Sequence, residues 1–114
     1  MRLLQLLVVA VMLGSTTLPA LADAVPVSIV SATGVGPKTV TIVVKTSPNA
    51  ACEAREDVTI NRSLQHISLG QGTAGDDGTA TWTIRFEYNG TRHVTVTCKV
   101  GNDEGSASTD VRVQ

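Results

Sequence analysis

The stretch Gly78–Val100, GTATWTIRFEYNGTRHVTVTCKV, decides the fold of this chain. Apolar and polar residues alternate along two arms, and the apolar positions are Ala80, Trp82, Ile84, Phe86, Val94, Val96, Cys98 and Val100. A period of two is typical of half-buried antiparallel strands. Asn89-Gly90 between the arms favours a type I′ turn, because both residues tolerate positive φ. The stretch therefore predicts a β-hairpin.

The same stretch predicts the centre of the core. It holds the single Trp, the single Phe and the single Tyr of the chain, together with one of its two cysteines. Large aromatic side chains dominate the energetics of small cores. We therefore place in the core the side chains of Trp82, Ile84, Phe86, Val94 and Val96.

The N-terminal segment predicts a secretory signal peptide over residues 1–22. Met1-Arg2 gives a positive start, Leu3–Leu13 is an apolar run, and Ala20-Leu21-Ala22 is an A-x-A cleavage pattern. The alternatives are a membrane anchor or a buried helix, but the apolar run is shorter than the ~20 residues that a spanning helix needs. We expect a secreted, extracellular domain over residues 23–114, with no membrane insertion after cleavage.

The charge of the expected mature chain is close to neutral. The sequence has nine Lys and Arg and ten Asp and Glu, and cleavage removes Arg2, so eight basic residues face ten acidic ones and the net charge is −2. This is too little positive charge to neutralise phosphates. The composition argues against nucleic acid as a partner and against electrostatic attachment to a membrane.

The two cysteines predict one disulfide, between Cys52 and Cys98. A small secreted domain has an oxidising environment, and two cysteines allow a single intramolecular pairing. Two free thiols, or a bridge between chains, are the alternatives. Closing a loop of this length contributes about 4 kcal/mol in the chain-entropy description.

The rest of the expected mature chain has an all-β pattern. Val, Thr, Ile and Ser dominate, turn residues punctuate short alternating runs, and no stretch keeps a helical period. We expect an edge strand over Val25–Ser31, a strand over Lys38–Thr46, a third from Ala51 that breaks at Glu56-Asp57, and a weak fourth over Leu64–Leu69. Seven or eight antiparallel strands predict an immunoglobulin-like β-sandwich, with a small barrel as the alternative.

The pattern resembles secreted bacterial immunoglobulin-like domains. Three motifs carry the resemblance: T-x-P-x-A-x-C ending at Cys52, D-x-G-x-A-x-W ending at Trp82, and V-T-V-T-C ending at Cys98. Antibody-type domains place a Tyr two residues before the second Cys, where this chain has Val96. The bridge therefore need not join the two sheets. Such domains serve as spacers, stalks and binding surfaces, so the resemblance implies a fold more than a function.

A second resemblance is to the apochromoproteins that carry enediyne antibiotics. Asp77-Gly78-Thr79-Ala80 and Gly90-Thr91-Arg92 carry it. It implies an apolar ligand held in a cleft between loops. The chain departs from that family in having one possible disulfide where the family has two.

The sequence predicts no catalytic centre, no metal site and no cofactor. His66 and His93 are the only imidazoles, and His93 lies on the polar face of its strand. No Ser lies in G-x-S-x-G. The acidic pairs in loops fit turn chemistry, and whether they bind calcium is left open. Gly70-x-Gly72 lacks the Lys-Ser/Thr of a phosphate loop and is expected to be flexible.

The leading functional hypothesis is a non-catalytic binding or structural module that acts through loops at one end. We expect a soft loop over Gly70–Gly78 and a turn over Gly101–Gly105, because mobile polar loops on a rigid scaffold are common binding sites. The candidate residues are Gly72, Thr73, Asp76, Asp77, Asn102, Asp103 and Glu104. The partner would be an unidentified protein or cell surface. The alternatives are a carrier of a small apolar ligand, or a secreted enzyme inhibitor.

Overall fold

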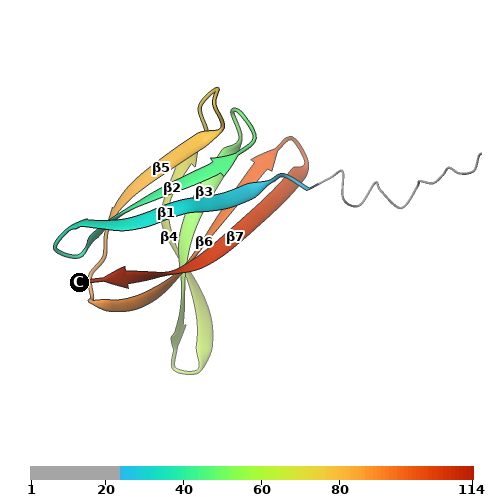
Figure 1. The fold of residues 1–114 in the computed structure, drawn as a ribbon. Helices are drawn as coiled ribbons and strands as arrows, with labels where there is room; N and C mark the ends of the chain where they lie inside the picture. The colour runs from blue at the N-terminus through green and yellow to red at the C-terminus, as the bar shows by residue number, and fades with distance from the viewer. Residues whose placement is uncertain (1–23) are drawn as a thin grey trace, which may run out of the picture.

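The computed structural model describes residues 24–114, which form a two-layered β-sandwich (Figure 1). The signal peptide predicted over residues 1–22 lies outside the described residues. The strands are β1 (Val27–Gly36), β2 (Thr39–Thr46), β3 (Ala51–Ile60), β4 (Ser63–Thr73), β5 (Thr79–Arg85), β6 (Gly90–Val100) and β7 (Asp103–Val113). The order β1-β2-β5 makes one sheet and β4-β3-β6-β7 makes the other, with every neighbouring pair antiparallel. The all-β prediction is confirmed.

The core lies between the two sheets and follows the alternation in the sequence. On β2, Val40, Ile42 and Val44 are buried while the residues between them are not. The five side chains predicted for the core are all buried, as are Val111 and Val113 of the last strand. Val100 is exposed instead, because it lies at the end of β6, directly before the turn at Gly101.

The hairpin predicted around Asn89-Gly90 is wrong. Within the described residues, β5 pairs with β2 alone, and β6 pairs with β3 and β7 in the other sheet. Gly90 has positive φ but Asn89 does not, so a type I′ turn is absent there. Residues 86–89 instead cross between the layers: the Phe86 amide donates to the Lys38 carbonyl at 2.8 Å, and the Phe86 side chain is buried. Alternation identifies a strand but not its partner.

A type I′ geometry occurs instead between β3 and β4. Asn61 and Arg62 both have positive φ, 54° and 67°, as this two-residue turn requires. The break predicted at Glu56-Asp57 is wrong, because β3 continues to Ile60. The irregularity lies two positions earlier, as a register shift between Ala54 and Arg55 against β4.

The β3–β4 hairpin extends beyond the sandwich. β3 pairs with β6 from Ala51 to Asp57, but with β4 as far as Ile60. The outer part of the hairpin therefore projects past the rest of the sheet, which Figure 1 shows as the yellow-green loop at the bottom. In antibody constant domains the fourth strand joins the sheet of the first two strands. Here it pairs with the third strand, and this placement creates the projection.

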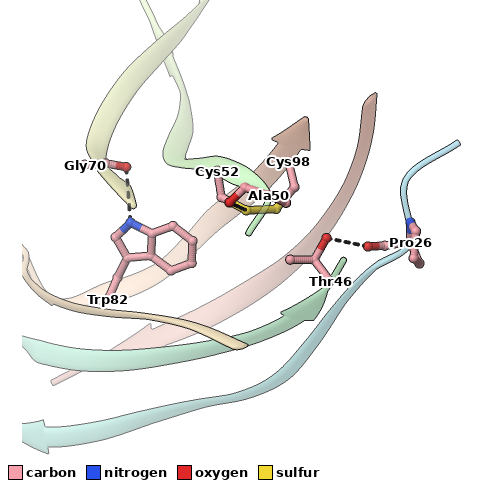
Figure 2. The surroundings of a disulfide bond; sticks show 7 residues. All are labelled: Pro26, Thr46, Ala50, Cys52, Gly70, Trp82 and Cys98. Carbon is pink, nitrogen blue, oxygen red and sulfur yellow. Dashed lines mark hydrogen bonds between the residues drawn. A yellow bond between two sulfur atoms is a disulfide. The ribbon is translucent and has the colours of Figure 1, made fainter. Parts of the chain in front are cut away.

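The disulfide is confirmed, and it lies within one sheet. Cys52 on β3 is directly opposite Cys98 on β6, with their Cα atoms 4.0 Å apart. Figure 2 shows the bridge and, near it, the Trp82 ring with its indole nitrogen toward Gly70. The Trp82 indole N–H donates to the Gly70 carbonyl at 3.2 Å, and its ring lies over Gly70 and Gly72. Gly70-x-Gly72 is therefore part of β4 and forms the seat of the Trp ring, not a flexible loop.

Glycine is required where the N-terminal segment meets β7. Ala24 forms a parallel bridge with Glu104, and the Val25 amide donates to the Glu104 carbonyl at 3.3 Å. A Cβ at Gly105 would collide with the Val25 carbonyl. Residues 24–114 contain no helix with the length and apolar character of a membrane span.

Candidate binding cleft

A cleft lies between the projecting β3–β4 hairpin and the crossing that follows β5. Its volume is about 560 Å³, which is within the usual range for small-molecule sites. The lining residues come from β3, β4, the crossing and the start of β6, and they are Glu56, Val58, Ile60, Ile67, Leu69, Arg85, Phe86, Glu87, Tyr88 and Arg92.

One wall of the cleft is the inner face of the hairpin. Val58 and Ile60 have the same parity along β3 as Cys52 and Ala54, which are buried in the core. Ile67 lies opposite Glu56 on the same face. These apolar side chains continue the core face past Arg85, where β5 ends, so Ile60 and Ile67 are 48% and 45% exposed.

The other wall is the crossing from β5 to β6. Phe86 is buried and belongs to the core, whereas Tyr88 is 67% exposed. The crossing holds this position because the Phe86 amide is tied to Lys38 across the sheet. The cleft therefore has a fixed aromatic base and an apolar wall on a projecting hairpin.

An ion pair forms the polar part of the cleft. The guanidinium of Arg92 lies 3.6 Å from the carboxylate of Glu56, and both side chains are largely buried. The same guanidinium lies 5.7 Å from the centre of the Tyr88 ring, within reach of a cation–π interaction. It also donates to the Asn89 carbonyl at 3.4 Å. Arg92 thus connects β3, β6 and the crossing.

The residues predicted as binding loops gather at the opposite end of the sandwich. Thr73 and Lys99 both lie opposite Ala51, so the β4–β5 loop and the β6–β7 turn flank the same strand end. Gly72 and Thr73 belong to β4, and Asp103 and Glu104 belong to β7. The soft loop predicted over Gly70–Gly78 is thus shorter than expected.

Hydrogen bonds fix the residues of that shorter loop. The Asp77 side chain accepts from the Thr79 amide at 2.9 Å, and the Asp77 carbonyl accepts from Lys45 at 2.5 Å. The hydrogen bond from the Thr79 backbone N–H is the main cause of the lowered pKa of the Asp77 carboxyl. Asp77 therefore acts as a turn-forming residue. Within residues 24–114, no group of three or more His, Cys, Asp or Glu side chains is placed to hold a metal ion.

A third polar cluster crosses the outer face of the four-stranded sheet. Asp57 accepts hydrogen bonds from Thr95 at 2.7 Å and from Arg55 at 3.2 Å, and it lies 2.5 Å from His66 Nδ1. The hydrogen bond from the Thr95 hydroxyl is the main cause of the lowered pKa of the Asp57 carboxyl, and His66 and Arg55 lower this pKa further. Because Asp57 lies between the hydroxyl of Thr95 and the ring of His66, the cluster is not ordered as a nucleophile–base–acid triad.

Neighbouring groups extend this outer-face cluster. Thr95 Oγ1 lies 2.8 Å from Ser108 Oγ, and His93 Nδ1 lies 2.9 Å from Asp110. His93 and His66 are both about half exposed. The arrangement joins four adjacent strands by polar contacts.

The cleft is not predictable from the sequence alone, because its residues are ordinary core and surface types. Ile67 and Leu69 have the inward alternation of a core strand, and Glu56 was expected at a strand break. Their role depends on β3 being longer than its pairing with β6. No local signal in the sequence specifies that difference in length.

No protein-family model matches this sequence, and no curated protein is significantly similar to it. The fold itself defines the class, an immunoglobulin-like β-sandwich. A solved structure with a similar fold is a superoxide reductase (neelaredoxin) from Ignicoccus hospitalis, with a TM-score of 0.54 and 15% identity, over 83% of this chain and 85% of that chain. At this identity the similarity shows the fold alone.

Proposed function

We propose that this protein is a secreted, non-catalytic binding domain that carries a small, largely apolar ligand in the cleft between the β3–β4 hairpin and the β5–β6 crossing. One observation supports this most strongly: apolar side chains of the core face continue beyond the sandwich and line a cleft of about 560 Å³. The resemblance to ligand-carrying apochromoproteins implies the same kind of activity.

Exposed apolar surface gives the physical reason. Removing apolar surface from water stabilises a complex by roughly 25 cal/mol per Å², and contiguous exposed apolar patches often mark binding sites. Val58, Ile60 and Ile67 lie together on the hairpin face, and Tyr88 extends the surface on the other wall. A ligand in the cleft would contact both walls at once.

Binding of Nile red, a neutral dye whose emission rises in apolar surroundings, tests the proposal. The wild type is expected to bind the dye, and Ile67→Glu, which places a charge in the cleft, is expected to weaken binding at least about tenfold. Val30→Glu is the matched control, because Val30 is also an exposed aliphatic residue but lies on β1, outside the cleft. Equal loss in both variants, or no dye binding by the wild type, would refute the proposal.

A second candidate is binding of a protein or cell surface at the opposite end. A shallow polar depression of about 400 Å³ favours it, since its lining includes Gly72 and Thr73, two of the residues predicted for binding. Deleting the segment predicted as a loop from Gly70 would be a poor test, because Gly70 and Gly72 belong to β4 and seat the Trp82 ring. Asp76→Lys is the sharper test, because it changes the charge of this end without touching the core. If a protein partner binds at this end, its affinity should fall in this variant.

A further inference from the structure

We infer that the ligand of the cleft is neutral and presents a hydrogen-bond donor and acceptor side by side, as a carboxamide or lactam does, to Glu56 and Arg92. This inference rests on the proposed function, and it specifies the chemical class of the ligand.

The balance of charge in the cleft favours a neutral ligand. The lining contains two cationic side chains, Arg85 and Arg92, and two anionic ones, Glu56 and Glu87. An anion bound at Arg92 would also lie close to the Glu56 carboxylate, and a cation bound at Glu56 would lie close to the guanidinium. A like charge within ~4–6 Å disfavours an ionised group, and partial burial strengthens this repulsion.

The ion pair itself has hydrogen-bonding capacity left over. Its N–O separation of 3.6 Å is longer than an ordinary hydrogen bond. A guanidinium has five N–H donors, and among the described residues the guanidinium of Arg92 donates to the Asn89 carbonyl, at 3.4 Å. Within residues 24–114, the ion pair of the Glu56 carboxylate is the one with Arg92.

Burial makes this spare capacity significant. The Arg92 and Glu56 side chains are 21% and 13% exposed, and polar groups in such positions normally have partners. A donor and an acceptor lying side by side match a primary carboxamide or a lactam edge, whose C=O accepts from the guanidinium while its N–H donates to the carboxylate. The ring system of such a ligand would lie on Val58 and Ile67.

Three probes with the same ring system test the inference: 2-naphthamide, N,N-dimethyl-2-naphthamide and 2-naphthoate. The first is neutral with donor and acceptor, the second lacks the donor, and the third is an anion. Dissociation constants come from displacement of Nile red. We expect 2-naphthamide to bind about fivefold or more tightly than either analogue, which corresponds to one hydrogen bond.

Conservative variants separate recognition from folding. Glu56→Gln and Arg92→Gln are expected to reduce the preference for 2-naphthamide to less than about twofold, and circular dichroism with thermal unfolding checks that both variants keep the wild-type fold. Lys99→Gln is the control, because it breaks an ion pair with Glu104 at the other end of the sandwich and should leave the preference unchanged.

The outcomes distinguish this inference from the proposed function. Nile red binding with equal affinities for the three probes, or tighter binding of 2-naphthoate, would overturn the inference and leave the cleft as an apolar site. Failure of Nile red and all three probes to bind would overturn both.

Discussion

Removing the Cys52–Cys98 bridge should lower stability without changing the fold. The cysteines are 46 residues apart, and the chain-entropy relation gives about 4 kcal/mol for a closed loop of that length at 25 °C. Because Cys52 and Cys98 lie opposite each other on adjacent strands, the hydrogen bonds of the β3–β6 ladder hold the same register without the bridge. We expect Cys52→Ala/Cys98→Ala to retain the strand content of the wild type.

Guanidinium unfolding of the double variant measures the effect. Its free energy of unfolding should fall by about 4 kcal/mol, and its m-value should rise because the unfolded chain exposes more surface. Both cysteines are buried, so alanine also removes two sulfur atoms from the core. The reduced wild type keeps these atoms and isolates the contribution of the bond.

Two results would refute this reasoning. A loss below about 1 kcal/mol with an unchanged m-value would mean that the bridge does not constrain the unfolded chain. A loss of Nile red binding in the folded double variant would mean that the bridge also shapes the cleft, which lies toward the other end of β3.

Three further predictions concern stability. Gly105→Ala should destabilise by about 2 kcal/mol in chemical unfolding, because its Cβ would collide with the Val25 carbonyl, whereas Gly36→Ala, where a Cβ meets nothing within 4 Å, should cost little. Trp82→Phe should cost about 2 kcal/mol, since it removes the hydrogen bond to Gly70 and part of a buried ring; a change near zero would contradict the role of Gly70-x-Gly72 as its seat. The folded state lowers the pKa of Asp57, so the stabilising contribution of this carboxylate is complete above the unfolded pKa near ~3.9 and is lost as pH falls through the lower folded pKa. Asp57→Asn should therefore reduce the fall of the unfolding temperature at acidic pH. An unchanged fall at acidic pH would count against the hydrogen-bond network of Asp57.

The sequence was sufficient to predict the class of fold because burial follows alternation. Val40, Ile42 and Val44 on β2, and Trp82 and Ile84 on β5, have the period of two that one buried face requires. The disulfide followed from the cysteine count. The alternation is a local pattern and the disulfide follows from a residue count, and the structure confirms both.

Strand pairing was harder to predict. Asn89-Gly90 has ideal turn chemistry, yet the chain there crosses between the sheets, because the buried Phe86 and its bond to Lys38 outweigh the preference for a turn. Conversely, Asn61-Arg62 is a weaker signal and forms the two-residue turn. Tertiary contacts determine where the turns form, and such contacts cannot be inferred from a few neighbouring residues of sequence.

The candidate site depended on that same long-range information. The residues predicted for binding lie at the end where the loops are fixed by hydrogen bonds, such as those of Asp77. The cleft lies where β3 and β4 extend beyond the neighbouring strands. The pairing of β6 with β3 is what places Arg92 next to Glu56. Its binding role stays a prediction.

The most direct test of the account is a backbone-amide NMR titration of the wild-type protein with 2-naphthamide. We expect shift changes at Ile67, Phe86 and Arg92, which line the cleft, with Asp76 and Asn102 unaffected. Changes confined to Asp76 and Asn102, or no changes with saturating probe, would contradict it.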